Sequence, residues 1–409
     1  MSNLPLLPSR GAPGNLVGVT RLFIAGPNAN RSTHLEAYGP LLPQSQALAD
    51  ELEVSGLTGR GGAGFPVARK LRALSGPPGA IVANGSEGEP GSRKDHTLLE
   101  HAPHLVLDGL SALAQSVEGS PRLIIMTPVD LMSAMRQALT ERGNDERFEL
   151  SPVRHDRFVQ GEASAVVSAL GGGDGTPFDK PDHLTTVGLR KKPTLLYNVE
   201  TLAHIALVAR LGGDWFRSVG DPDDPGTRLV TLSGDGVETR VREMESGASL
   251  RHVLSDAGVD ASALSAVLVG GYHGEWRDTA DLDLPMSNAR GAKVRVWAGV
   301  LRVLAKESCG LTTSDGILTY LASQTARQCG PCQYGLPALA EEFSALVNGS
   351  VNEDEFGRMR GLLRDLPGRG ACHHPDGSVR FTMSALSVFA DEAELHLQGS
   401  CSVNGRGSA

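Results

Sequence analysis

The stretch Gly56-Leu-Thr-Gly-Arg-Gly-Gly-Ala-Gly-Phe-Pro-Val-Ala-Arg-Lys70 contains five glycines within its first nine residues. Glycine permits positive φ and leaves no side chain where the backbone must approach a flat or anionic group. Consecutive N–H groups in such a loop form an anion-binding concavity, and a helix that begins after Pro66 adds its positive dipole. Arg60 and Lys70 place positive charge on either side. The spacing matches neither a Rossmann GxGxxG nor a Walker loop, and in isolation such a loop is more often an ordinary turn.

Three further loops have unusual compositions. Residues 80–95, AIVANGSEGEPGSRKD, begin with an apolar run that predicts a buried strand, and then carry two glutamates, three glycines and a proline. Residues 158–165, FVQGEASA, place Gly161 and Glu162 at a predicted helix start. Residues 192–201, KPTLLYNVET, contain Asn198, which by itself is more often a turn residue or a helix cap than a ligand. Agreement between four separate loops favours a ligand site.

Composition restricts the possible classes of protein. The 38 Lys and Arg and 47 Asp and Glu of the 409 residues give a formal net charge of −9, which argues against a nucleic-acid or anionic-membrane surface. No run of 18 apolar residues occurs, and no basic segment precedes an apolar one at the start, so we expect neither a membrane span nor a signal peptide. Five cysteines, an odd number, suit a reducing cytoplasm better than a disulfide framework.

Hydrophobic periodicity divides the chain into segments of different character. Alternating helices and buried strands predict an α/β domain whose sheet is covered by helices, with a long helical stretch over 96–117. A shorter β-rich module follows, and after residue 315 apolar residues recur at helical spacing, which predicts a small all-α bundle. The expected segments are a wrapping arm (1–45, with a short strand at 22–25), the α/β domain (46–226), the β-rich module (227–305), the helical bundle (306–397) and a disordered tail (398–409).

The cysteines carry a second chemical signal. Cys329-Gly-Pro-Cys332 precedes an amphipathic helix, and Cys372 lies in the run Gly370-Ala-Cys-His-His-Pro375. In an intracellular protein a CxxC pair indicates a metal, an iron–sulfur cluster or a redox pair more often than a disulfide. A free CxxC pair with a buried Cys372 is the plainer alternative. Cys309 and Cys401 fit neither group, and we expect a core thiol and a tail thiol.

Taken together, the RGGAGF, NxxExEPGxxKD, GEASA and KPTLLYNVET runs and the cysteine pattern resemble the NADH-binding flavoprotein (FMN and iron–sulfur) subunit of respiratory complex I, the F subunit of NADH-quinone oxidoreductase, from about Gly56 to about Phe389. Relatives of that family occur in NAD-linked hydrogenases and formate dehydrogenases. The resemblance implies an α/β FMN-binding domain, then a small β-grasp-like (SLBB-type) module for interdomain packing, and a C-terminal all-α iron–sulfur bundle.

The resemblance also implies roles for individual residues. Phe65 matches the aromatic that stacks on the nicotinamide and Glu87 a loop carboxylate beside it, so we expect these two in the reaction itself. The residues expected to bind FMN and the dinucleotide are Gly59, Arg60, Gly61, Gly62, Gly64, Lys70, Asn84, Glu87, Glu89, Gly161, Glu162, Lys180, Asn198 and Thr201. Solvated surface charge is the alternative for Lys180 and Glu89.

The sequence departs from the family pattern most on the dinucleotide side. Family positions are replaced at Ser86, Ala163, Tyr197, His183 and Ala73, whereas the expected flavin contacts are better kept. In the [4Fe–4S] pattern CxxCxPCxxG, followed by a distant cysteine, Cys329, Cys332 and Cys372 match but the first ligand position is Ala326. Three options follow: His373 or His374 as the fourth ligand, a three-iron or water-ligated cluster, or zinc in a Cys3His set.

These residues support three hypotheses about function. In the first, NAD(P)H reduces FMN by hydride transfer, and electrons leave through a cluster to a ferredoxin-like or thioredoxin-fold iron–sulfur partner subunit, with a larger oxidoreductase complex as the setting. In the second, a ferredoxin-linked flavoprotein uses another donor or reduces NAD(P)+. In the third, the chain is a non-catalytic flavin- or zinc-binding assembly subunit. We expect a cytoplasmic protein, peripheral to the membrane where partner subunits attach it, with no nucleic-acid partner.

Overall fold

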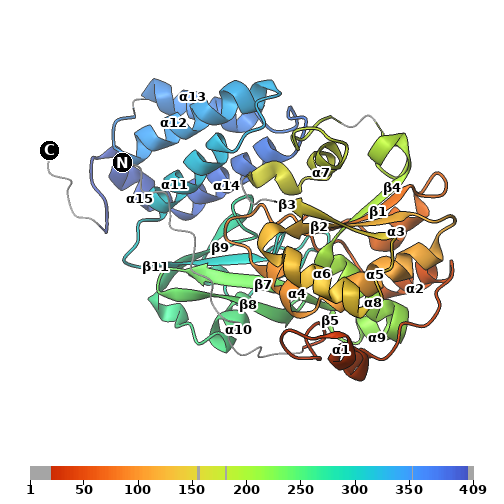
Figure 1. The fold of residues 1–409 in the computed structure, drawn as a ribbon. Helices are drawn as coiled ribbons and strands as arrows, with labels where there is room; N and C mark the ends of the chain where they lie inside the picture. The colour runs from red at the N-terminus through yellow and green to blue at the C-terminus, as the bar shows by residue number, and fades with distance from the viewer. Residues whose placement is uncertain (1–19, 154–156, 180–181, 352, 404–409) are drawn as a thin grey trace.

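The computed structural model describes residues 20–153, 157–179, 182–351 and 353–403. An α/β unit, a second sheet and a helical bundle pack on one another, with the helical bundle above the second sheet in Figure 1. Lys180, the first 19 residues of the expected arm and the tail beyond residue 403 lie outside the described part.

The first sheet is parallel, and all of its strands except the edge strand β3 are almost fully buried. Its four strands run in the order β3-β2-β1-β4, with bounds β1 (Ala80–Asn84), β2 (Arg122–Pro128), β3 (Phe148–Val153) and β4 (Thr194–Asn198). Successive side chains enter different cores: Ile81 joins the large core around α5 and α8, whereas Val82 packs in a separate cluster with Val166. β1 and β4 are in register such that Asn84 lies opposite Asn198 at the carboxyl ends of the strands.

Helices cover this sheet as the alternating pattern predicts. They are α2 (Leu48–Ser55), α3 (Val67–Arg72), α4 (Lys94–His101), α5 (Pro103–Ser116), α6 (Met132–Glu141), α7 (Ala163–Leu170), α8 (Val199–Leu211) and α9 (Gly213–Arg217). The helical stretch expected over 96–117 is confirmed, but it consists of two helices that meet at Ala102. Pro103 has no N–H to continue α4 but fits the first position of α5.

The second sheet has five strands in the order β10-β9-β11-β7-β8, and only β11 and β7 are parallel among its pairs. Its strands are β7 (Thr227–Gly234), β8 (Val237–Glu245), β9 (Leu264–Val269), β10 (Glu275–Asp278) and β11 (Val300–Ala305), with α10 (Leu250–Asp256) against them. A short ribbon of β5 (Gly220–Asp221) and β6 (Asp224–Pro225) precedes it. The β-rich character expected of this module is confirmed, and its β-grasp-like class stays a prediction.

The C-terminal bundle has its own core. Its helices are α11 (Gly310–Ser323), α12 (Leu336–Val347), α13 (Glu353–Asp365), α14 (His374–Val388) and α15 (Ala390–Leu397). Buried Phe343 and Phe381 lie in one apolar cluster with Trp276 of β10, so the bundle and the second sheet share a core. The CxxC pair lies at the short π-helical turn Pro331–Gly335 that leads into α12. Short 3-10 turns complete the elements: η1 (Val129–Leu131), η2 (Phe158–Gly161), η3 (Leu189–Lys191), η4 (Ala261–Ala263) and η5 (Thr279–Asp281).

The described part of the N-terminal arm includes α1 (Arg31–Tyr38) and connects two units. The strand expected at 22–25 is wrong, because the backbone bends there although Leu22 and Phe23 are buried. The N–H groups of Arg21 and Leu22 both donate to Glu243 Oε2 of β8 at 2.9 Å instead of pairing with a strand. Those two bonds hold the arm onto the second sheet.

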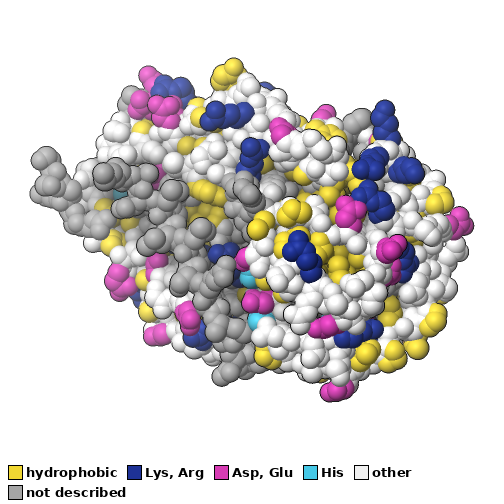
Figure 2. All heavy atoms as spheres, viewed as in Figure 1, with side chains coloured by type: hydrophobic (Ala, Val, Ile, Leu, Met, Phe, Trp, Pro, Cys, Tyr) yellow, Lys and Arg dark blue, Asp and Glu magenta, His cyan; other side chains and the backbone are white. Residues whose placement is uncertain are grey.

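Within the described residues, no helix is both long and apolar enough to cross a membrane. The face shown in Figure 2 carries Lys and Arg, Asp and Glu, and apolar side chains interspersed. This mixture agrees with the mild net negative charge of the sequence.

Candidate functional site

A cavity of about 520 Å³ opens at the carboxyl end of the first sheet, where β1 and β4 finish. Ligands of parallel α/β sheets bind at this edge, and the volume is in the range of cofactor sites. Of the expected site residues, those that line it are Gly61, Gly62, Asn84, Glu87, Glu89, Gly161, Glu162, Asn198, Cys372 and His373. Four loops far apart in the sequence therefore meet at one space.

The glycine loop forms one lip of this cavity. The N–H of Gly59 donates to Phe65 O at 2.9 Å, which closes the loop into a tight turn. A Cβ on Gly61 would lie 3.2 Å from Asn198 Cβ, so the loop rests directly on the end of β4. Gly62 has φ +100°, a conformation that a residue with a side chain rarely adopts. Glycine is thus required here by close approach and by backbone conformation.

The expected charges of this loop do not face the cavity. The Arg60 guanidinium is buried and donates to Pro225 O and Thr227 O at 3.1 Å, and it pairs with Asp224. Its backbone N–H donates to Thr201 Oγ1 at 2.9 Å, so Thr201 holds the loop and does not line the cavity. Arg60 anchors the loop to the start of the second sheet.

Four more of the residues expected at the site lie outside the cavity lining: Gly59, Gly64, Phe65 and Lys70. Phe65 is 46% exposed, and the Arg69 guanidinium lies 5.6 Å from its ring centre. Lys70 Nζ donates to Leu196 O at 2.6 Å and lies 4.9 Å from the Tyr197 ring centre. The Phe65 ring is therefore not part of the cavity wall in this structure, and its expected stacking on the nicotinamide stays a prediction.

The loop after β1 uses its first polar residues for its own structure. Asn84 Nδ2 donates to Gly161 O at 2.9 Å, and Asn84 Oδ1 accepts from Ser86 N. Both carboxylate oxygens of Glu87 accept hydrogen bonds, from the N–H groups of Asp95 and His96 at 3.1 Å and from the Ser92 hydroxyl. Glu87 thereby caps the start of α4, where a negative charge is stabilised by the helix dipole.

Glu89 is the carboxyl group in this loop that is not fully bonded. Its Oε2 accepts from Tyr272 N at 3.0 Å, while its buried Oε1 has no hydrogen-bond partner in the described part of the chain. Burial raises the pKa of Glu89 to about 8, against the opposing effect of the Tyr272 and Gly91 backbone N–H groups. At neutral pH this side chain is mainly a carboxylic acid, which can donate a hydrogen bond to a ligand.

Beside Asn198 lies a buried charge network that the sequence pattern did not predict. The Lys94 ammonium lies 2.7 Å from Asp95 Oδ1 and 3.0 Å from Glu200 Oε2. Burial disfavours its charged form, but these two carboxylates together raise the pKa of Lys94. Lys94 and Asp95 line the cavity. Both lie in the unusual run 80–95 that also contains Glu87, and this was the feature of the sequence from which they could have been expected at the site.

The helix start expected at Gly161 and Glu162 is confirmed, and Asn198 is a helix cap, the commoner use of asparagine. Glu162 is the N-cap of α7 and accepts from Ser164 N at 2.7 Å. Asn198 Oδ1 accepts from Glu200 N at 3.0 Å and caps α8. Asn198 is therefore both a helix cap and a residue of the cavity wall.

The opposite wall comes from the second sheet and the bundle, including the β-rich module that was expected only to pack. It is formed by Gly270, His273, Trp297 and Ala298 together with His374, Asp376 and Arg380. The Arg295 and Arg380 guanidinium carbons lie 4.0 and 4.1 Å from the Trp297 ring centre. Trp297 Nε1 is buried without a hydrogen-bond partner among the described residues. No local periodicity marks these residues, which explains why they were missed.

The three expected cysteine ligands gather next to the cavity. Burial raises the pKa of Cys332 to about 12, and the neighbouring thiols of Cys329 and Cys372 add to the effect, while a hydrogen bond from Ala326 backbone opposes it. Cys372 also lines the cavity. The thiols and the cavity therefore share one wall.

Neither histidine completes the set of ligands. His374 is buried, with Nε2 donating to Leu321 O at 2.9 Å and Nδ1 accepting from His273 Nε2 at 3.0 Å. The side chain of His373 is 99% exposed and lies near Asp376, so the expected metal-ligand role has no support in its position. Among the described residues, the only group of three or more His, Cys, Asp or Glu whose ligand atoms all lie within 4.8 Å is elsewhere. Spread thiols suit a polynuclear cluster better than one zinc ion.

Comparison with known proteins identifies two regions of the chain, which correspond to the cavity and to the cysteine site. The model for the Nuo51 FMN-binding domain matches residues 52–207, and the model for the NADH-ubiquinone oxidoreductase-F iron–sulfur binding region matches residues 312–396. The chain belongs to the family of the NADH-quinone oxidoreductase F subunit. This member of the family thus carries an FMN-binding domain and an iron–sulfur binding region.

Individual relatives extend over most of the chain. The F subunit of NADH-quinone oxidoreductase of Escherichia coli (strain K12) is 28% identical over 375 residues, which cover 86% of this chain and 84% of that protein. NADP-reducing hydrogenase subunit HndC of Solidesulfovibrio fructosivorans is 27% identical, and the match covers 86% of this chain and 76% of that protein. A solved NAD+-reducing [NiFe]-hydrogenase in the H2-reduced state has a TM-score of 0.78 at 25% identity. That match covers 86% of this chain and 62% of the hydrogenase chain.

Proposed function

We propose that this chain passes electrons from NAD(P)H through FMN to an iron–sulfur cluster and then to a partner electron carrier. The observation that supports this most is the single cavity that joins the glycine loop, the ends of β1 and β4, and Cys372. A flavin cavity and a sulfur-ligand site that share a wall suit stepwise electron transfer. The family membership points the same way.

FMN fits the residues on the sheet side of the cavity. We assign to it the bare backbone of Gly61 and Gly62, the amides of Asn84 and Asn198, and the buried ammonium of Lys94. When bound, FMN would supply the group that can accept a hydride and release electrons one at a time. The chain's own part is to hold the isoalloxazine on a side-chain-poor loop and to keep positive charge fixed next to it.

The dinucleotide contacts come from the opposite wall in this proposal. Glu89 offers a buried carboxylic acid with one unbonded oxygen, and Trp297 offers an unbonded indole N–H, among the residues that the structure describes. Arg380 adds positive charge beside that indole ring and suits a phosphate. These side chains stand in for the family positions that are replaced on the sheet side, and Phe65 is not among them.

For the cluster we propose ligation by Cys329, Cys332 and Cys372 with no fourth protein ligand. Position 326 is alanine, and His373 and His374 point elsewhere or have both nitrogens bonded. A fully cysteine-ligated [4Fe–4S] cluster does not fit this chain. A three-iron or water-ligated cluster does, with a higher potential than a four-thiolate cluster because one negative charge is missing.

The partner we propose is a thioredoxin-fold or ferredoxin-like iron–sulfur protein within a larger cytoplasmic complex. The names of the relatives, which are subunits, support a multi-subunit setting. The mixed surface charge and net charge of −9 give no reason to propose nucleic acid as a partner.

Stopped-flow absorbance of the FMN-loaded chain tests this function. Mixing anaerobically with NADH or NADPH should bleach the flavin band, and chain without FMN provides the blank. FMN-loaded chain that neither nucleotide bleaches would contradict the proposed donor and would favour the ferredoxin-linked alternative. A chain that binds no FMN would contradict the enzyme assignment as a whole.

A further inference from the structure

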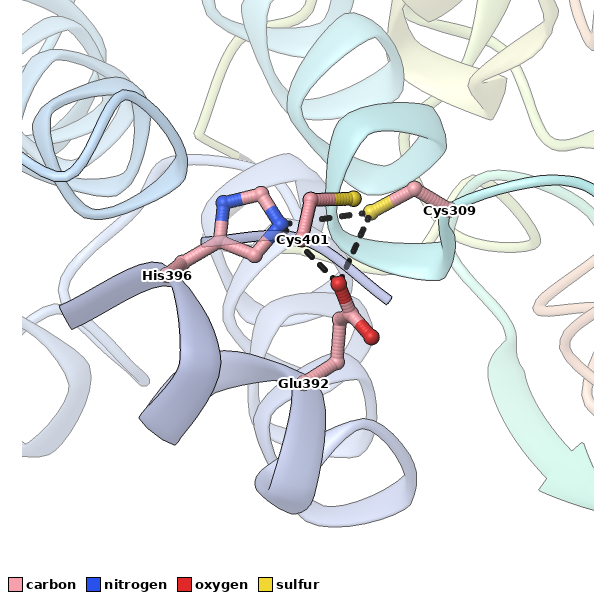
Figure 3. A group of neighbouring side chains, drawn as sticks. All are labelled: Cys309, Glu392, His396 and Cys401. Atoms are coloured by element: carbon pink, nitrogen blue, oxygen red, sulfur yellow. Dashed lines mark hydrogen bonds and ion pairs between the residues drawn. The ribbon is translucent and has the colours of Figure 1, made fainter. Parts of the chain in front are cut away.

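Two cysteines that belong to neither the cavity nor the expected cluster come together in the bundle. Cys309 is the N-cap of α11, and Cys401 follows α15 in the segment expected to be disordered. Glu392 and His396 project from one face of α15 between them (Figure 3). One ligand atom from each of the four residues lies within 4.8 Å of all the others. Three elements separated by up to 92 positions in sequence, from 309 to 401, thus converge on one point.

Spacing within the group fits a four-coordinate ion. His396 Nε2 lies 3.5 Å from Cys309 Sγ and 3.2 Å from Glu392 Oε1, and Glu392 Oε1 lies 3.9 Å from Cys309 Sγ. Tetrahedral zinc with bonds of about 2.0–2.3 Å requires ligand separations of about 3.3–3.8 Å. Only small movements of the side chains would bring these atoms onto such a tetrahedron.

Neighbouring groups orient the ligand atoms. His396 Nδ1 donates to Val347 O at 2.5 Å, so the lone pair of its Nε2 faces the group. Ser402 N donates to Glu392 Oε1 at 3.0 Å, and the Ser402 hydroxyl bonds the other oxygen. Thr312 N, in the first turn of α11, donates to Cys309 Sγ at 3.5 Å and so fixes the position of the sulfur. A hydrogen-bonded carboxylate and a tautomer fixed by a carbonyl are typical of the shell around metal sites.

We propose that Cys309, Glu392, His396 and Cys401 bind one Zn²⁺ in a closed structural site. Two thiols lose their protons to solvent on binding, and no oxidation or reduction occurs. Two sulfurs, one imidazole and one carboxylate select a borderline-soft tetrahedral cation over Mg²⁺ or Ca²⁺. Cys309 and His396 are 7% and 6% exposed, so the ion would be closed off from substrate. Its role is to tie the segment after α15 to the start of α11.

Metal content of the full chain tests the site. The protein is purified under reducing conditions without chelator, as wild type, Cys401→Ser and Cys329→Ser, and circular dichroism confirms folding. We expect about one zinc per chain in wild type and Cys329→Ser, and at least a fivefold loss in Cys401→Ser. The proposal would be overturned if wild type contained no zinc, or if zinc were lost in Cys329→Ser and not in Cys401→Ser. A Cys309–Cys401 disulfide in non-reducing mass spectrometry would also overturn it.

A serine pair gives a second readout that leaves all four ligands in place. Ser402→Ala removes the hydroxyl that orients Glu392, and should weaken zinc affinity about tenfold in a chelator competition. Ser400→Ala changes a hydroxyl two residues earlier, outside the group, and should leave the affinity unchanged. Equal affinities in the two variants would count against the site. Co²⁺ bound to unmutated chain should show thiolate charge-transfer absorbance, and its absence would overturn the proposal without relying on a variant.

Discussion

Asn198 Nδ2 donates to Asp95 Oδ2 across 2.6 Å and so joins the end of β4 to the first turn of α4. The other atom of the same amide, Oδ1, accepts from Glu200 N and caps α8. One side chain therefore connects three elements at the edge of the cavity. Because Gly61 rests on its Cβ, the position of the glycine loop depends on it as well.

Replacing Asn198 by alanine should cost stability and cofactor binding together. Loss of the α8 cap lowers the free energy of unfolding by about 1 kcal/mol, and FMN affinity should fall about tenfold or more because the cavity wall shifts. Ser249→Ala is the matched control, since Ser249 caps α10 by accepting from His252 N, and α10 packs against the second sheet. It should lose similar stability in urea unfolding and keep its FMN affinity; equal FMN losses in both would contradict the role of Asn198 in the cavity.

Gly61→Ala should reduce FMN uptake with little change in folding elsewhere. The added Cβ would lie 3.2 Å from Asn198 Cβ, so the loop must move away from the end of β4. Gly76→Ala serves as the control, because a Cβ there meets nothing within 4 Å. We expect at least about a tenfold higher Kd for FMN in the first variant alone, measured by flavin fluorescence. Unchanged uptake by Gly61→Ala would show that this loop does not form the flavin wall.

Glu89 should make stability depend on pH. Burial raises its pKa from 4.5 to about 8, so between these values the folded protein keeps a proton that the unfolded chain releases. The stabilising contribution is therefore full below about pH 4.5 and is lost as pH rises through about 8. Glu89→Gln should flatten the fall in the urea midpoint between about pH 5 and about pH 8, because it removes a group that binds an extra proton in the folded state over this range. An exposed control, Glu118→Gln, should leave the profile of the wild type; identical profiles for all three would refute the raised pKa.

Ala326→Cys should restore the missing thiolate of the cluster. With Cys329, Cys332 and Cys372 it completes a four-cysteine set, so the reduction potential should fall, and iron content should approach about four per chain. Ser350→Cys adds a thiol beyond α12 and should change neither quantity. The measurement is iron and sulfide content with potentiometry after anaerobic reconstitution. A potential that is identical in the wild type and in Ala326→Cys would contradict a cluster with an unfilled protein ligand position.

Local patterns predicted the elements that form the cavity. The buried strand β1 appeared as the apolar run that begins residues 80–95, and the start of α7 was expected at Gly161 and Glu162. The four loops were expected to form one ligand site, and carboxyl ends of parallel strands share an edge. They do meet, although several of their polar side chains bond within the protein.

What the sequence did not reveal depends on contacts between distant segments. Arg60 reads as a phosphate ligand until Asp224, 164 residues away, is seen to hold its guanidinium. Trp297 and Arg380 have no motif around them, and only packing of the bundle on the second sheet brings them to the cavity. Cys309 and Cys401 likewise appeared unrelated. Periodicity reports which face of an element is buried, and it does not report which element covers that face.

Titration of the anaerobically purified chain with FMN, followed by flavin fluorescence and calorimetry, tests the central claim most directly. The cavity between the glycine loop, Asn84 and Asn198 predicts uptake of about one FMN per chain, with quenched fluorescence, and weaker uptake by Gly61→Ala and Asn198→Ala but not by Gly76→Ala. A folded chain that takes up no FMN, or that binds it equally in all of these variants, would contradict the claim.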